Sequence, residues 1–309
     1  MPTVKFPLGD PESAALVECS ARLGRDPLFV QGSTGNTSIK VCDTLWIKAS
    51  GRWLANAGQE QMFVPVDLPA ARYSISNSID PSVTAPGPLR ASVETAMHCV
   101  IPWRVVMHVH SVNSIAWAVR RDAEEQFTQL LRGLPWKWIP YVASGLALAR
   151  KIEQAVFENP GTRAFILGNH GIVTAGKDCA SAHQMLLEIE DRVALPSRLC
   201  SSCDSNGQRL ANWLSEDALS RRILSGGYLY PCHALYLRRF GPAAMARASV
   251  EDFTPEAVAA LRGLAEVIAR IPGSAPVRYL TVSEIDELLA ANVYHTAQIQ
   301  GAAPAINLA

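Results

Sequence analysis

Segments typical of strands alternate with segments typical of helices over the first two thirds of the chain, and this alternation constrains the fold most. Strands are expected at residues 38–41, 45–48, 105–110, 163–167 and 172–174. Helices are expected at residues 11–23, 92–100, 111–119, 146–157 and 179–195. Asp10 and Asp178 stand where helix-capping side chains are preferred. This order indicates an α/β domain over residues 1–198.

The remaining segments are more polar or less periodic. Residues 69–90 are rich in Pro, Ser and Asn, so an irregular segment is expected there. From Pro196 to Gly207 the composition is that of a linker, and residues 199–309 form a C-terminal extension. In the extension the patterns predict helices at residues 209–224, after Thr254 and from a cap at Ser283, and strands at residues 234–237 and 277–281. We therefore expect an α/β extension that packs on the first domain or covers its site.

Charge and cysteine usage exclude several classes of protein. Lys plus Arg and Asp plus Glu number 28 each, so no net field attracts nucleic acid or an anionic membrane surface. The first ten residues lack the pattern of a secretory signal, and no apolar run is long enough to span a membrane. The seven cysteines, an odd number, favour reduced thiols in the cytoplasm. We expect a soluble cytoplasmic protein that acts on a small molecule.

A single CxxC is formed by Cys200 and Cys203. With Cys232 and His233 it would supply four ligands for a structural zinc ion. No second CxxC is present and the surrounding residues are typical of a loop, so we favour an ordinary loop.

Three histidines form a candidate metal site. In the expected strand 105–110, side chains alternate between faces, so His108 and His110 point the same way with α-carbons about 7 Å apart. Taken alone, this pair favours two unrelated polar residues at a strand end. His170 follows another strand in an Asn-His-Gly turn that can aim it at a neighbouring strand end. Three neutral imidazoles with an open position are typical of a catalytic metal site.

At these residues the sequence resembles the class II aldolase and adducin family, over roughly residues 10–198. Several motifs occur in the family's order: residues 35–38 (GNTS), 49–51 (ASG), 92–98 (SVETAMH), 108–110 (HVH), 139–141 (IPY) and 169–171 (NHG). The resemblance implies a class II aldolase-like three-layer α/β/α domain with a central β-sheet. It also implies a homotetramer whose sites are completed across subunit boundaries.

The resemblance assigns roles to individual residues. His108, His110 and His170 would hold a divalent metal, Zn²⁺ first and Mn²⁺, Co²⁺ or Fe²⁺ as alternatives. Glu94, one helical turn before His98, would be the catalytic acid/base. The substrate phosphate would be bound by two glycine loops and the stretch before Glu94, at Gly35, Asn36, Ser50, Gly51 and Ser92.

Three features depart from the family's pattern. Val93 stands where the aldolases tend to have a second serine, which weakens the case for a phosphorylated substrate. No tyrosine occurs between His110 and Pro140, where fuculose-phosphate aldolase has a catalytic one, so the proton donor to the leaving fragment is unassigned. The extension is absent from the short aldolases, and it contains no GxGxxG pattern for a dinucleotide.

The function expected is that of a metal-dependent aldehyde-lyase acting on a small hydroxylated carbonyl compound, a sugar or sugar phosphate, through an enediolate. A decarboxylase of a β-keto acid and an epimerase are alternatives, because both would use the same site. An adducin-like scaffold without catalysis is the alternative from another class. It predicts decay of the metal ligands, whereas the three histidines and Glu94 are all present.

Overall fold

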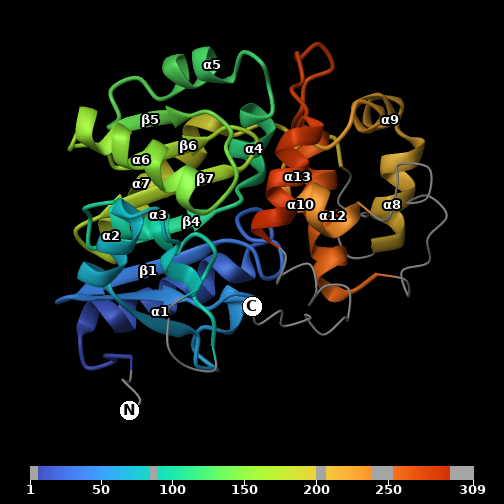
Figure 1. Cartoon of the computed structure of the whole chain (residues 1–309). Helices are drawn as coiled ribbons and strands as arrows, with labels where there is room; N and C mark the ends of the chain where they lie inside the picture. Colours follow the sequence, from blue (N-terminus) through green and yellow to red (C-terminus); the bar gives the residue numbers. More distant parts are fainter. Residues whose placement is uncertain (1–5, 84–88, 200–206, 239–252, 293–309) are drawn as a thin grey trace.

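The computed structural model describes residues 6–83, 89–199, 207–238 and 253–292. Up to residue 193 the predicted helices and strands are present, and two strands, at residues 63–67 and 136–139, and a helix at residues 123–130 were not predicted (Figure 1). In chain order the elements are α1 (Pro11–Arg25), β1 (Asn36–Val41), β2 (Thr44–Lys48), the 3₁₀ turn η1 (Leu54–Asn56), β3 (Phe63–Asp67), α2 (Leu68–Ser76), the 3₁₀ turn η2 (Pro81–Val83), α3 (Thr95–Val100), β4 (Val105–Val109), α4 (Val112–Ala118), α5 (Ala123–Leu130), β5 (Trp136–Ile139), α6 (Leu146–Glu158), β6 (Ala164–Leu167), β7 (Gly171–Gly176) and α7 (Cys179–Val193).

In the described part of the chain, seven strands form one sheet in the order β3-β2-β1-β4-β7-β6-β5. Neighbouring strands are antiparallel except for β5 and β6, which are parallel. The register pairs His108 of β4 with Asn36 at the start of β1 and with Val173 near the start of β7. Because these central strands pair antiparallel, the end of β4 lies beside the starts of β1 and β7, all at the same end of the strands.

Helices cover both faces of the sheet. Along β4, Val105, Met107 and Val109 pack against α1 and α7, whereas Val106 packs against α3 and α6 on the opposite face. This strict alternation is the strand periodicity of two that the sequence predicts. A second cluster packs α2 against β2 and β3 on the same side as α3. The predicted three-layer α/β/α domain is confirmed.

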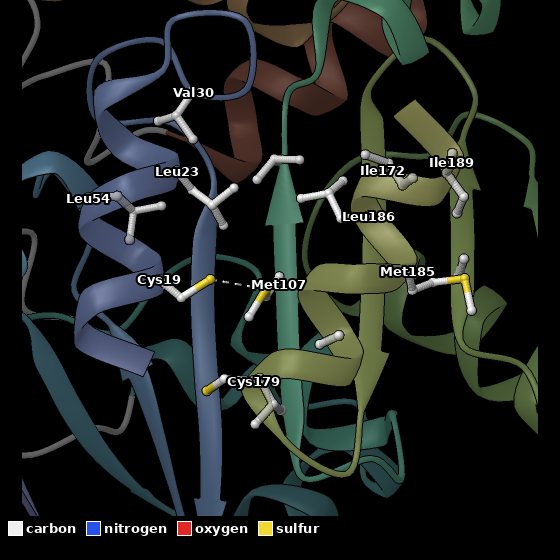
Figure 2. Close-up of a cluster of buried hydrophobic side chains, with 14 of the residues drawn as sticks. Cys19, Leu23, Val30, Leu54, Met107, Ile172, Cys179, Met185, Leu186 and Ile189 are labelled. Carbon is white, nitrogen blue, oxygen red and sulfur yellow. Dashed lines mark hydrogen bonds between the residues drawn. The ribbon is translucent and has the colours of Figure 1, made fainter. Parts of the chain in front are cut away.

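Figure 2 shows the core between α1, β4 and α7, with Leu23, Met107 and Leu186 among its members. The Sγ atom of Cys19 lies 3.9 Å from the sulfur of Met107 in this cluster. Leu186 is fully buried, so a Leu186→Ala change would remove packing worth about 2–5 kcal/mol of stability. The layer therefore holds β4, which carries two of the three candidate metal ligands, firmly in place.

The described part of the extension consists of helices beside the sheet domain (Figure 1). They are α8 (Gly207–Glu216), α9 (Ala218–Ser225), α10 (Pro231–Leu237), α12 (Pro255–Arg270) and α13 (Val282–Ala291). One apolar cluster joins Val112 and Ile115 of α4 to Leu261 and Leu264 of α12. Among the described residues, none of the helices has the length and apolar character needed to cross a bilayer.

Three predictions for the extension are wrong. Residues 234–237 lie in helix α10, because Pro231 starts a helical turn and a short apolar run does not distinguish strand from helix. Residues 277–281 form only an isolated bridge between Val277 and Arg120, and α13 begins after Thr281 rather than Ser283. The described extension is thus helical rather than α/β.

The predicted helix over residues 209–224 is two helices, because Asp217 accepts from the amide of Ser220 and starts α9. The helix that follows Thr254 is confirmed as α12.

Residues 69–90 also differ from the prediction, since α2 occupies the first part of this range. Asp67 caps the helix by accepting from the amide of Ala70, and Leu68, Ala71 and Ile75 are buried along one face. Helix α3 starts at Thr95 rather than at residue 92, which leaves Glu94 as its N-cap residue. Cys200 and Cys203 lie outside the described residues.

Candidate metal centre

The three predicted histidines come together at the end of β4 and the start of β7. His108 and His110 extend from the end of β4, and His170 from the turn before β7, and all three side chains are buried. Their possible ligand atoms lie within 4.8 Å of one another. The ring centroids are separated by 4.9 Å for His108 and His110, and by 5.0 Å for each of these rings and His170.

The hydrogen bonds of the rings define which nitrogens face the centre. The Nδ1 atom of His108 lies 3.1 Å from the carbonyl oxygen of Ile172, which fixes Nδ1–H as the donor. Its Nε2 atom lies 3.1 Å from Nε2 of His110. Burial lowers the pKa of His110 well below its usual range, and burial also lowers the pKa of His170 to about 4. Three buried imidazoles with one nitrogen each turned toward a common centre fit a divalent metal ion.

Glu94 lies beside this cluster. Its Oε2 atom is 3.4 Å from Nε2 of His108, and its Oε1 atom is 3.5 Å from Nε2 of His170. Asn36 donates to Oε2 at 2.7 Å and Ser144 donates to Oε1 at 3.1 Å. Burial by itself raises the pKa of Glu94, whereas positive charge at the neighbouring histidines, His108 first, and the hydrogen bond from Asn36 lower it. Because the imidazoles are neutral when they bind a metal, a divalent ion on them would supply that positive charge and keep the carboxylate ionised, in the form that accepts a proton.

His98 supports Glu94 indirectly. One ring nitrogen lies 2.6 Å from Oγ of Ser38, and the other contacts Oδ1 of Asn36. Burial, followed by the charge of Lys40, lowers the pKa of His98 to about 3. A neutral His98 thus orients the Asn36 amide so that its Nδ2–H points at Glu94.

The predicted phosphate-binding residues share one pocket of about 840 Å³ with Glu94, His110 and His170. They are Gly35, Asn36, Ser50, Gly51 and Ser92. Gly35 has φ +64°, and a Cβ atom there would lie 2.9 Å from the carbonyl oxygen of His108, so only glycine fits. The amide of Ser50 donates to the carbonyl oxygen of Arg90 at 2.8 Å, so this amide is already paired within the protein.

Lys48 is a pocket residue that the sequence reasoning missed. It ends β2 and is 3% exposed, and its Nζ atom donates to the carbonyl oxygens of Ser33 at 2.5 Å and Gly35 at 2.8 Å. Burial lowers the pKa of Lys48 to about 7, while the charge of Glu94 acts in the opposite direction. The available signal was a lysine within the apolar strand TLWIK, directly before the glycine loop 49–51.

The extension also contributes to the pocket, through Cys232, Leu235 and Tyr236 of α10 and Leu288 of α13. The hydroxyl of Tyr236 lies 3.3 Å from Oγ of Ser33. Cys232 and Tyr236 are four residues apart and therefore lie on the same face of α10. The sequence reasoning considered Cys232 only as a ligand of a structural zinc ion, and it missed Leu235 and Tyr236 because it predicted a strand at residues 234–237.

The chain belongs to the class II aldolase and adducin family. The profile of the Class II Aldolase and Adducin N-terminal domain matches residues 14–195, so the extension lies beyond the matched region.

Several curated relatives have names that describe a reaction. The L-fuculose phosphate aldolase of Methanococcus maripaludis is 29% identical over 162 residues, which cover 51% of this chain and 81% of that protein. The methylthioribulose-1-phosphate dehydratase of Bacillus pumilus is 28% identical over 176 residues, 50% of this chain and 77% of that protein. A third relative, the uncharacterized oxidoreductase YuxG of Bacillus subtilis, is 28% identical over 196 residues, and the match covers 56% of this chain but only 28% of that protein's length.

Among solved structures, the N-terminal class II aldolase domain of a conserved protein from Thermoplasma acidophilum has a TM-score of 0.53 to this chain. It is 23% identical, and the match covers 62% of this chain and 95% of that one. This similarity concerns the fold of the sheet domain.

Proposed function

We propose that this protein is a metal-dependent aldehyde-lyase that makes or breaks a carbon–carbon bond next to the carbonyl group of a small hydroxylated compound. The observation that carries the proposal is the position of Glu94, whose two carboxylate oxygens lie 3.4 and 3.5 Å from ring nitrogens of His108 and His170. A base at this distance from a metal site can move a proton at a carbon activated by the metal.

His108, His110 and His170 would hold the metal, most suitably Zn²⁺ because all three donors are neutral nitrogens, with Mn²⁺, Co²⁺ or Fe²⁺ as alternatives. When bound, the ion would polarise the substrate carbonyl and stabilise the negative charge that forms on its oxygen.

In the direction of bond formation, Glu94 takes the proton from the carbon next to the carbonyl of a hydroxyketone. The electron pair of that C–H bond moves to give an enediolate, and its carbon then attacks an aldehyde. The new bond forms at the aldehyde carbon, its oxygen takes up one proton from solvent, and Glu94 releases the proton it removed to solvent, so the protons balance. In cleavage these steps run backwards, and Glu94 returns its proton to the enediolate carbon. Asn36 and Ser144 hold the two carboxylate oxygens in place throughout.

The pocket suits a substrate with an anionic group. Ser50, Gly51 and Ser92 line it together with Arg52 and Arg90. Hydroxyls and guanidinium groups are donors that bind phosphate or carboxylate. We propose that Gly35, Asn36, Ser50, Gly51 and Ser92 form the binding site for a sugar phosphate or a related anion.

Dehydration is the second candidate reaction, because two curated relatives are named methylthioribulose-1-phosphate dehydratase, at 28% and 26% identity. A dehydratase would also begin by removing a proton next to the carbonyl, but the enediolate would then lose hydroxide, which leaves as water. Decarboxylation and epimerisation remain alternatives at the same site. A scaffold without catalysis is less well supported, because the three histidines and Glu94 are retained and lie together.

Product analysis tests the proposal. Zinc-loaded protein is incubated in deuterated water with dihydroxyacetone, with and without a phosphate group, and with a panel of phosphorylated ketoses and β-keto acids. We expect deuterium to enter the carbon next to the carbonyl, and we expect ketose cleavage to release an aldehyde. Loss of water without an aldehyde would establish the dehydratase instead. No exchange and no product from the metal-loaded protein would contradict the enzymatic proposal.

A further inference from the structure

The C-terminal extension contacts one of the three histidines directly. Cys232, in α10, places its Sγ atom 3.1 Å from Nδ1 of His110. Cys232 is 4% exposed and His110 is 5% exposed, so solvent does not compete for this contact. The two residues are 122 positions apart in the sequence. They meet because α10 packs beside the metal site, where both residues line the same pocket.

The chemistry of imidazole defines the direction of this hydrogen bond in the metal-bound form. If Nε2 of His110 is the ligand atom, the neutral ring carries its hydrogen on Nδ1. Nδ1–H then donates to the Cys232 sulfur. Such a partner of a ligating histidine fixes the tautomer and the orientation of the ring. For His108 the same task falls to the carbonyl oxygen of Ile172, within the sheet itself.

The extension also holds the turn that carries His170. Asn169, the preceding residue, is buried and has φ +50°, a left-handed conformation that is uncommon outside glycine. Its Nδ2 atom donates to the carbonyl oxygens of Leu229 at 2.8 Å and Arg278 at 3.0 Å. Arg278 donates from Nη1 to Oδ1 of Asn169 at 2.7 Å. Three hydrogen bonds from the extension therefore hold this side chain in place.

We propose that the extension is a positioning element of the metal centre, in which Cys232 orients His110 and Arg278 holds the Asn169 turn that presents His170. The inference rests on the metal site of the proposed function. Two of the three histidines are oriented by residues that lie outside the matched family domain, residues 14–195. The extension thus acts on the metal site directly and is more than a cover over the pocket.

Metal release tests the Cys232 contact. Zinc-loaded Cys232→Ala and Cys232→Ser are mixed with a chromophoric chelator, and the rate of zinc loss is compared with that of the wild type. Losing the acceptor is expected to speed release by about 10–100-fold in Cys232→Ala, since outer partners of metal ligands commonly contribute that factor to affinity. Cys232→Ser keeps an acceptor and is expected to recover part of the loss.

Cys179→Ala is the matched control, because Cys179 is also a buried free cysteine and lies in α7, outside the pocket. It is expected to release zinc at the wild-type rate. The Co²⁺-loaded proteins give a second readout, because the visible absorption of Co²⁺ changes with ligand orientation. Zinc release from Cys232→Ala at the wild-type rate would overturn the role of Cys232. Equal rates of release from Cys232→Ala and Cys232→Ser would also overturn it, because they would show that the hydrogen-bond acceptor on this side chain has no effect.

The Asn169 turn is tested with Asn169→Gly, which permits the left-handed backbone but removes the three hydrogen bonds. Zinc release is expected to be about tenfold faster. Ser78→Gly is the control, because Ser78 also has positive φ, at 65°, and lies in a surface turn. A release rate equal to that of the wild type for Asn169→Gly would overturn the second contact.

These measurements need no substrate, so they separate the positioning role from the reaction. A wild-type protein that holds zinc but catalyses no exchange would contradict the proposed function, while the variants still decide whether the extension positions the ligands. A wild-type protein that holds no zinc would overturn both. Thermal unfolding of the metal-free variants identifies any loss of the fold itself.

Discussion

Asn36 donates a hydrogen bond from Nδ2 to Oε2 of Glu94 at 2.7 Å, and Asn36 is also the residue that pairs with His108 across β1 and β4. The same strand register therefore sets both the position of a metal-site histidine and the orientation of the proposed base. A ring nitrogen of His98 contacts Oδ1 of the same Asn36 amide. The orientation of the amide is therefore fixed, and with it that of the Glu94 carboxylate.

We expect Asn36→Ala to lower the rate of proton exchange by about a hundredfold while the zinc content stays unchanged. Misplacing a catalytic group by about 1 Å can have this effect, and the variant removes the donor that orients Glu94. Asn77→Ala, an exposed asparagine at the end of α2, serves as the control. Wild-type exchange in Asn36→Ala would show that Glu94 needs no such support.

Glu94→Gln separates the role of base from that of metal ligand. The change keeps the shape of the side chain but removes its capacity to accept the proton, so turnover is expected to fall by about 10²–10⁴-fold with full metal content. Metal analysis and deuterium exchange on the same sample measure both quantities. Loss of metal together with activity would make Glu94 a ligand, and exchange at the wild-type rate would assign the base to another group.

Purified wild-type protein is expected to hold about one divalent ion per chain, and the double variant His108→Ala, His110→Ala is expected to lose it. Two of the three converging imidazoles are removed, and His170 by itself does not form a chelating site. Elemental analysis after zinc loading and dialysis gives the stoichiometry. A wild-type protein that stays empty under these conditions would contradict the site.

Lys48 predicts a pH dependence of stability. Its pKa falls from about 10.5 to about 7 on burial, so between these values the folded protein binds fewer protons than the unfolded chain. The free energy of unfolding should therefore rise with pH from 7 to 9, by up to about 1.4 kcal/mol per pH unit from this residue. Lys48→Met should flatten that rise in urea titrations of the metal-free protein, whereas Lys151→Met, on the exposed side of α6, should leave it unchanged. Equal slopes in Lys48→Met and the wild type would contradict the prediction.

A homotetramer is the expected assembly, because the family resemblance implies sites completed across subunit boundaries. Light scattering at micromolar concentration measures the mass directly. A monomer that turns over substrate would show that the chain completes its own site, with α10 and α13 already lining the pocket from within the same chain.

Local sequence patterns determined much of the sheet domain. Asp10 and Asp178 cap α1 and α7 as predicted, because a capping carboxylate acts within three residues of itself. The strand period of two places His108 on the face opposite Met107, whatever the rest of the chain does. The family motifs then linked His170 and Glu94 to this pair before any geometry was known.

Tertiary structure alone decided the contacts of the extension. Residues 234–237 are a short apolar run compatible with strand or helix, and their place in α10 depends on packing against α12. The contacts of Cys232 with His110 and of Arg278 with Asn169 join residues 122 and 109 positions apart. Periodicity and capping act over a few residues, whereas these contacts depend on the path of the whole chain, so no local pattern could have revealed them.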